Sequence, residues 1–233
     1  MGHEFGDLPL LFFFVLTSGE NCRLTHQTHP HVFPYLCSML RLHTETDPSW
    51  VKIAESDIEE ILTDHAFCEQ KAASTAISLI VKFPEHAELV KEMAALAREE
   101  MEHFQRVHEI IIKRGYRLGR ERKDVYVNEL AQFVKKDVSR SAHLIEKLLF
   151  SAMIEARSCE RFRVLSENIG DEELSEFYRE LMASEAGHYT LFITLARKYG
   201  EPEGIDVDKR WREFLEFEEG LIAKYGTTGT IHG

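Results

Sequence analysis

Two Glu-x-x-His pairs, Glu100 with His103 and Glu185 with His188, are the residues of this chain best suited to chemistry. In an α-helix a spacing of three residues places both side chains on one face, about 60° apart, so that they can bind one metal ion together. Carboxylate oxygens combined with imidazoles suit iron or manganese better than a metal that prefers thiolates. Two such pairs therefore predict a site for two metal ions.

A further glutamate precedes each pair on a separate helix, Glu69 about 30 residues before Glu100 and Glu155 about 30 residues before Glu185. The strings Glu69-Gln-Lys-Ala-Ala and Glu155-Ala-Arg-Ser-Cys align, which indicates two duplicated helical hairpins. Each glutamate interrupts a largely apolar helical stripe, and burying a carboxylate without a partner costs several kcal/mol. Two divalent cations would neutralise all four charges. The predicted metal ligands, and through the metal the catalytic residues, are Glu69, Glu100, His103, Glu155, Glu185 and His188.

Neighbouring polar residues are expected to support this site. His65 precedes Glu69 by one turn and could be a third nitrogen ligand, although a hydrogen bond to a ligand is the preferred interpretation. Glu160 lies about 140° around the helix from Glu155, outside the predicted metal-binding face. The residues that we expect at the surface or behind the ligands are Glu99, Glu102 and Glu160, and those that we expect to be packing residues are Cys68 and Cys159.

Four long helices are required to carry these residues, and the hydrophobic pattern predicts them. From Trp50 onward apolar residues recur at helical spacing, with breaks at Pro84, Gly115, Gly170 and Gly200. The predicted bundle helices lie near 50–81, 86–114, 139–168 and 171–199, with a short helix near 126–136 and a fifth long helix near 208–224 on the outside. The predicted fold class is all-α: a ferritin-like four-helix bundle with one long crossover and an extra C-terminal helix.

Residues 1–48 lack this periodicity and hold most of the prolines. We expect a poorly structured extension there, followed by the bundle domain over 49–233. The histidines at 26, 29 and 31 have no cysteine or acidic partner among them, so a solvated stretch is preferred to a metal-binding tract. Organised sequence begins shortly after Met39, which suggests the hypothesis that the native product starts at Met39. The intact mass of protein made from the native gene tests it.

The remaining composition favours a cytoplasmic protein without a membrane segment. The four cysteines form no Cys-x-x-Cys pair and are too few for a disulfide framework. The longest apolar run, Leu10 to Leu16, is far shorter than the roughly 20 residues that span a bilayer. Glu4 and Asp7 precede that run where a signal peptide would carry positive charge.

Two stretches of the helices resemble one family. They are Ile58-Glu-Glu-Ile-Leu-Thr-Asp-His-Ala-Phe-Cys-Glu-Gln-Lys-Ala-Ala and Ile154-Glu-Ala-Arg-Ser-Cys-Glu-Arg-Phe, and they are similar to the tRNA 2-methylthio-N6-isopentenyladenosine hydroxylases. The resemblance covers about residues 39–200 and leaves residues 1–38 outside the family pattern. It implies a ferritin-like non-haem di-iron enzyme that uses O2 to hydroxylate the isopentenyl group of a modified adenosine beside the anticodon. It further implies tRNA as partner and an external electron-transfer reductase.

A tRNA substrate would have to bind a protein whose formal net charge is −12, which argues against binding through bulk electrostatics. Residues 113–123, with a net charge of +5, are the candidate contact, and Tyr116 and Tyr126 could stack a base. The alternative is a solvated basic loop that follows a helix C-terminus. The candidate tRNA contacts are Lys113, Arg114, Arg117, Arg120, Arg122 and Lys123.

Other classes of protein share part of this pattern. A ferritin-type ferroxidase or iron-storage protein would have the same six ligands but would assemble into a large shell. A manganese catalase-like protein, or another di-metal oxidase, would differ in its metal and its turnover of peroxide. A purely structural helical module leaves the four glutamates on the inner helix faces unexplained.

Overall fold

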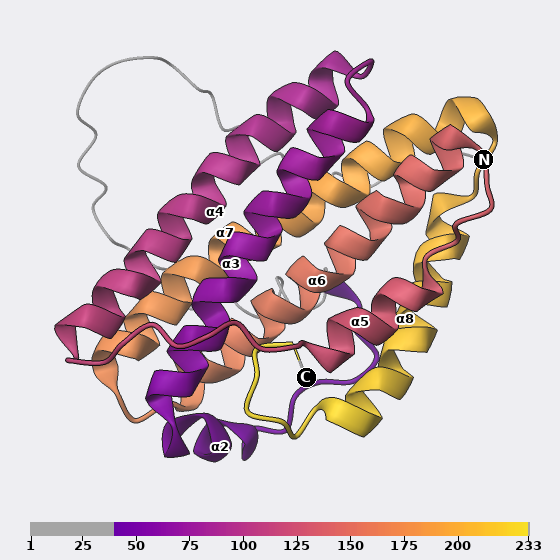
Figure 1. The fold of residues 1–233 in the computed structure, drawn as a ribbon. Coiled ribbons are helices and arrows are strands. Elements are labelled where there is room, and N and C mark those ends of the chain that lie inside the picture. The colour runs from indigo at the N-terminus through magenta and orange to yellow at the C-terminus, as the bar shows by residue number, and fades with distance from the viewer. Residues whose placement is uncertain (1–39, 233) are drawn as a thin grey trace, which may run out of the picture.

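The structure, a computed structural model, describes residues 40–232, and these form helices and connecting loops without a strand. Four long helices run side by side as a bundle (Figure 1). They pack as two hairpins, α3 on α4 and α6 on α7, and contacts between α4 and α7 join the hairpins. The predicted four-helix fold is therefore confirmed, with the helices α3 (Ile58–Lys82), α4 (Ala87–Lys113), α6 (Arg140–Asn168) and α7 (Glu172–Gly200).

Side-chain caps define where three of these helices begin. The carboxylate of Asp57 accepts from the backbone N–H of Glu60, and Asp171 accepts from that of Leu174. Ser139 caps α6 in the same way. Each cap satisfies a backbone donor of the first turn that has no partner inside the helix. The caps thus fix the residue at which each of these three helices begins. The position of the glutamate along the helix follows from that residue.

The first predicted helix, 50–81, is wrong in one respect, because it is broken into α2 (Trp50–Ser56) and α3. Asp57 lies between them with φ −150° and ψ 75°, outside the helical region. Its side chain is used to cap α3, so the helix that carries Glu69 begins anew after this residue. Hydrophobic periodicity continues through the break, which is why the sequence pattern did not reveal it.

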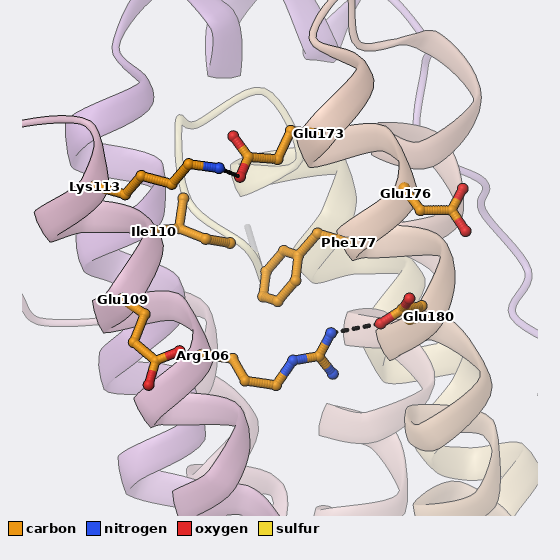
Figure 2. Close-up of a pocket in the computed structure, with 8 residues that line it drawn as sticks. All are labelled: Arg106, Glu109, Ile110, Lys113, Glu173, Glu176, Phe177 and Glu180. Atoms are coloured by element: carbon orange, nitrogen blue, oxygen red, sulfur yellow. Dashed lines mark hydrogen bonds and ion pairs between the residues drawn. The ribbon is translucent and has the colours of Figure 1, made fainter. Parts of the chain in front are cut away.

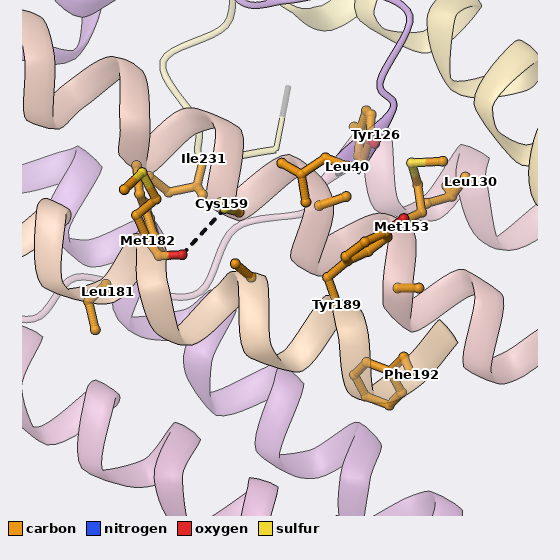
Figure 3. Packing of buried hydrophobic residues seen from close by; sticks show 14 of the residues in the cluster. Leu40, Tyr126, Leu130, Met153, Cys159, Leu181, Met182, Tyr189, Phe192 and Ile231 are labelled. Carbon is orange, nitrogen blue, oxygen red and sulfur yellow. Dashed lines mark hydrogen bonds between the residues drawn. The ribbon is translucent and has the colours of Figure 1, made fainter. Parts of the chain in front are cut away.

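The long crossover between the hairpins contains α5 (Val125–Phe133), and a 3-10 turn, η1 (Glu201–Glu203), precedes α8 (Val207–Tyr225). Helices α5 and α8 pack together and both contact α6. Tyr126 and Leu130 of α5 belong to the same buried cluster as Leu40 and Met153 (Figure 3). The predicted short helix and the extra C-terminal helix are therefore both present, and α8 shares the core instead of lying only on the outside.

A buried charge network ties α6 to α8 and to the loop before α2. The Arg157 guanidinium is fully buried and lies 2.6 Å from Glu218 and 2.9 Å from Glu160. Glu160 also accepts hydrogen bonds from the backbone N–H and the hydroxyl of Thr46. The expectation that Glu160 lies at the surface or behind the metal ligands is corrected, because it pairs with Arg157 inside this network.

The division into an extension over 1–48 and a domain over 49–233 stays a prediction. Residues 1–39, with the proposed start at Met39 and the three clustered histidines, lie outside the described residues. Residues 41–48 form a loop without regular secondary structure, although Leu40 and Thr46 are buried. Among the described helices none combines the length and apolar character needed to cross a membrane.

Replacing Arg157 by Met should lower the free energy of unfolding by about 3–5 kcal/mol, because it leaves the buried Glu218 without its cation. Urea unfolding followed by circular dichroism measures this. The matched control is Arg98→Met, whose ion pair with Glu102 is exposed and should contribute less than about 1 kcal/mol. Equal losses for the two variants would contradict a structural role for the network.

Candidate metal centre

The six predicted ligands meet at the centre of the bundle, and all of them are buried, none more than 6% exposed. They form two groups of four, and within each group one potential ligand atom per residue lies within 4.8 Å of the others. The structure therefore brings together every residue that the sequence predicted for this site. The first group is Glu69, Glu100, His103 and Glu185, and the second is Glu100, Glu155, Glu185 and His188.

Glu100 and Glu185 belong to both groups and lie between the two histidines. His103 Nδ1 is 3.5 Å from Glu100 Oε2 and 3.8 Å from Glu185 Oε1. His188 Nδ1 is 3.0 Å from Glu100 Oε1 and 3.7 Å from Glu185 Oε2. Each of these carboxylates thus presents one oxygen to each group, as a ligand shared by two metal ions would.

Glu69 and Glu155 each serve one group only. Glu69 Oε2 lies 3.8 Å from His103 Nδ1, and Glu155 Oε2 lies 4.0 Å from His188 Nδ1. The near-equal distances at the two ends agree with the similar make-up of the two hairpins, since α3 and α6 contribute one glutamate each and α4 and α7 one Glu-x-x-His pair each. The arrangement has an outer carboxylate at either end and two shared carboxylates between them.

Several ligand atoms of this cluster have no hydrogen-bond partner. Both carboxylate oxygens of Glu100, one oxygen of Glu185, Nδ1 of His103 and both ring nitrogens of His188 are buried without one. Buried polar atoms are normally paired, because leaving one unpaired costs its full desolvation. Carboxylate oxygens and imidazole nitrogens left free in this way fit the coordination of two hard or borderline divalent cations.

The charges of the cluster are also compatible with a bound cation. Burial raises the pKa of Glu69 and of Glu155 well above the usual range, and the neighbouring carboxylates raise both further. Burial alone would lower the pKa of His103, but the adjacent carboxylates of Glu100 and Glu69 raise it to about 10. Without metal the cluster therefore retains protons, which a metal ion must displace when it binds.

Two residues contact the candidate ligands from behind. His65 is fully buried, which lowers its pKa to about 3 and keeps the ring neutral, and its Nε2 lies 2.6 Å from Glu69 Oε1, at hydrogen-bond distance. The His65 ring stacks on Tyr178 with the ring centres 5.4 Å apart. Glu99 Oε2 lies 3.4 Å from His188 Nε2 and accepts at its other oxygen from the Ser184 hydroxyl.

These contacts agree with the interpretation that His65 forms a hydrogen bond to a candidate ligand. Glu99 lies behind His188, and groups in such a position orient the imidazole ring and tune its basicity. Glu102 is exposed and pairs with Arg98. Cys159 is buried and donates to the Met182 carbonyl, whereas Cys68 is partly exposed.

The basic segment 113–123 divides into paired and unpaired cations. Arg114 forms two hydrogen bonds with Asp171, the cap of α7, and Arg122 lies 2.5 Å from Glu60. Lys113 pairs with Glu173 in a groove of about 410 Å³ between α4 and α7 that also contains three further glutamates (Figure 2). The residues of the segment that are exposed and have no ion pair in the described part of the chain are Arg117, Arg120 and Lys123.

The prediction that Tyr126 stacks a base is wrong. Its side chain is fully buried, and its hydroxyl donates to Glu218 in the network around Arg157. Tyr116 remains partly exposed. The sequence placed Tyr126 close to the basic segment, but the residue lies on the face of α5 that packs into the core.

Two residues that the sequence analysis did not single out lie near the centre. Asp124 caps α5, and its Oδ2 is 2.9 Å from Nδ1 of His232. Both line the cavity that Glu155 also lines. The Asp before a helix was a readable cap signal for Asp124. His232 has no local signal, because only the fold brings it to this cavity.

The four-helix bundle with paired Glu-x-x-His helices defines the class of ferritin-like carboxylate-cluster proteins. A solved structure of this kind, protein 43 with aldehyde deformylating oxygenase activity from Synechococcus, matches with a TM-score of 0.75 and 31% identity. The match covers 82% of this chain and 95% of that one.

Residues 36–233 match the tRNA-(ms2io6A)-hydroxylase (MiaE) family, so the chain belongs to this family. The curated tRNA 2-(methylsulfanyl)-N(6)-isopentenyladenosine(37) hydroxylase of Pseudomonas putida is 41% identical over 160 residues, which cover 69% of this chain and 77% of the relative. The enzyme of the same name from Salmonella typhimurium is 29% identical and covers 78% and 83%, respectively. The resemblance described from the sequence is confirmed.

Bound Mn(II) should raise the melting temperature more at pH 8 than at pH 6. In the metal-free protein the raised pKa of His103, about 10, stabilises the fold fully below pH 6.5, and this contribution is lost as the pH rises towards 10. The raised pKa values of Glu69 and Glu155 act in the same direction, because their protonated forms favour the fold. The affinity for the metal rises with pH, because the candidate ligands lose their protons.

Thermal unfolding with and without Mn(II) at several pH values measures the difference between the two melting temperatures. A difference that shrinks from pH 6 to pH 8 would contradict the assignment of these buried groups as ligands. The control is Glu102→Gln, which removes an exposed carboxylate and should leave the pH trend unchanged.

Proposed function

We propose that this protein is a non-haem di-iron tRNA hydroxylase that oxidises the isopentenyl group of 2-methylthio-N6-isopentenyladenosine. The observation that carries the proposal is the pair of overlapping buried ligand groups, with their unpaired oxygen and nitrogen atoms, in a chain of the tRNA-hydroxylase family. The Pseudomonas and Salmonella relatives bear the name of this activity. Cytoplasmic tRNA would be the substrate and an electron-transfer reductase the partner.

The six cluster residues would hold two iron ions. Glu100 and Glu185 would serve both ions, because each belongs to both ligand groups, whereas Glu69 and Glu155 would serve one each. The bound iron, with O2 and two electrons from an external donor, would supply the oxidising power that insertion of oxygen into an unactivated C–H bond requires.

The protein itself would orient the ligands and exclude water. His65 would donate to the ionised Glu69 and fix the direction of that carboxylate, and Glu99 contacts the ring of His188 on the side away from Glu100. The burial of the ligands keeps bulk water from the cluster, which strengthens the electrostatic interactions inside it.

The rival functions differ from this proposal in measurable ways. A ferroxidase or storage protein would assemble into a large shell and oxidise iron without tRNA. A catalase-like protein would turn over peroxide. Size-exclusion chromatography and a peroxide assay separate these alternatives from a tRNA hydroxylase.

The direct test is a reaction of iron-loaded protein with O2, a reductant and tRNA that carries the isopentenyl modification. We expect the modified adenosine to gain one oxygen atom, measured by mass spectrometry of the nucleosides. Glu100→Ala should lower the rate by about 100-fold or more, since loss of even a group behind a ligand costs 10–100-fold. Glu102→Gln is the neighbouring control and should retain the rate. Iron-loaded protein that leaves the tRNA unchanged would overturn the hydroxylase assignment.

The unpaired cations of the basic segment should bind tRNA phosphates. Arg117→Glu combined with Arg120→Glu should raise the KM for tRNA and reduce its salt dependence by about two phosphate contacts, with kcat unchanged. The matched control reverses two exposed charges nearer the start of α4, Lys91→Glu with Arg98→Glu. Equal KM values in the two double variants would dismiss the basic segment as the tRNA contact.

A further inference from the structure

The groove of about 410 Å³ lies between α4 and α7, the two helices that carry the candidate histidine ligands. Two ion pairs cross it, Arg106 with Glu180 and Lys113 with Glu173, and Phe177 lies between them (Figure 2). The Arg106 guanidinium lies 5.1 Å from the centre of the Phe177 ring. The groove therefore has an apolar centre and a charged rim.

One chain of contacts leads from the groove to the first ligand group. The rings of Phe177 and His65 have their centres 5.9 Å apart, and His65 Nε2 lies 2.6 Å from Glu69 Oε1. All three side chains are buried. Two contacts between packed side chains thus connect the groove with a candidate metal ligand.

A second chain of contacts reaches the other ligand group from the same face. The side chain of Glu99 is 49% exposed, and its Oε2 lies 3.4 Å from His188 Nε2. Glu99 also accepts a hydrogen bond from Ser184 of α7, which lies one helical turn from Glu180 at the groove. A single carboxylate therefore separates this surface from the candidate ligand His188.

The charge of the groove distinguishes between classes of partner. Four glutamates and two cations line it, and both cations already pair with glutamates. Of the other two, Glu109 accepts from the uncharged Gln105 and has no ion pair among the described residues, and Glu176 pairs with Arg179 within α7. An excess of carboxylates repels the phosphates of RNA and attracts a cationic protein surface.

The cleft that contains side chains of the basic segment lies on other elements. Lys71 of α3, with Arg122 and Lys123 before α5, lines this cleft, and none of the three lines the groove. A protein in the groove and tRNA phosphates at the cleft would therefore use different side chains. Electron-transfer partners bind through small interfaces, below about 1,200 Å² in total, so a groove with a charged rim is a sufficient anchor.

We propose that the groove between α4 and α7 is the docking site of the electron donor, a small one-electron carrier protein whose cofactor is surrounded by lysine and arginine side chains. This inference rests on the proposed hydroxylase function, which needs two electrons from outside the chain. The donor places its cofactor over Phe177 and the neighbouring Glu99, where the two chains of contacts begin. Electron transfer slows steeply with distance, so these short chains favour entry at this face.

The electrons balance with two docking events per turnover. Each carrier is oxidised by one electron. The two electrons, with two protons, reduce one atom of O2 to water while the other atom enters the substrate as a hydroxyl group.

Cytochrome c, a basic protein with an exposed haem edge, is a probe for docking. At about 0.1 M ionic strength, charges more than about 10 Å apart are largely screened, so binding reports the local surface. The Kd for metal-free protein, measured by isothermal titration calorimetry, should rise by about tenfold in Glu109→Lys combined with Glu176→Lys, because two attractive charges become repulsive.

The matched control for this double variant is Glu201→Lys with Glu203→Lys. It makes the same change in net charge on the exposed η1 turn, which follows the C-terminal end of α7, whereas the groove lies near the N-terminal end. The Kd for cytochrome c should stay close to that of the wild-type protein.

Electron transfer is measured by anaerobic mixing of the diferrous protein with ferric cytochrome c. Two molecules of cytochrome c should be reduced for each pair of irons, and the bimolecular rate constant should fall by about tenfold in the groove variant. Duroquinone, a small uncharged oxidant that needs no docking site, should oxidise the wild-type protein and both double variants at the same rate.

The outcomes separate this inference from the proposed function. Iron-loaded wild-type protein that leaves prenylated tRNA unchanged would refute the function itself. If the wild-type protein is active, a groove variant that binds and reduces cytochrome c as the wild type does would overturn the docking site. A groove variant that loses affinity for tRNA would assign the groove to RNA and overturn the inference as well.

Discussion

The repulsion among four buried carboxylates is the constraint on which the rest of this structure depends. Two unit charges 4 Å apart interact by about 4 kcal/mol at the effective dielectric constant of a protein. At the bundle centre, ligand oxygens of Glu100 and Glu185 lie within 4.8 Å of one of Glu69 in the first group and of one of Glu155 in the second. Protons relieve part of this energy in the metal-free protein, as the raised pKa values show. Two divalent cations would relieve it completely, which supports the proposal that the cluster is a metal site.

The two hairpins bring these carboxylates together by contributing the same set of residues. Each hairpin supplies one glutamate and one Glu-x-x-His pair, and side-chain caps fix where three of the four helices begin. The additional helices do more than cover the bundle. Helix α8 supplies Glu218 to the buried network around Arg157, and His232 of the segment after it lines the cavity beside Glu155. The surroundings of the cluster therefore depend on elements far apart in the sequence.

The sequence predicted the parts that follow from local spacing. Helical periodicity located the bundle helices, and the i, i+3 pairs with their upstream glutamates identified the cluster residues that the structure brings together. The sequence did not predict contacts between residues that are far apart along the chain. Glu160 is buried because Thr46 and Arg157 pair with it, and Tyr126 is buried because Glu218 of α8 accepts its hydroxyl. The break at Asp57 was missed because periodicity continues across it, and His232 reaches the cavity only through the course of the folded chain.

The most direct test of this account is an anaerobic titration of the metal-free protein with Fe(II), with bound iron counted per chain. The account predicts that two ions bind, with release of protons from the cluster, and that Glu100→Ala and Glu185→Ala each impair both binding events because these residues serve both ligand groups. Binding of no iron, or binding that survives both substitutions, would contradict the central claim.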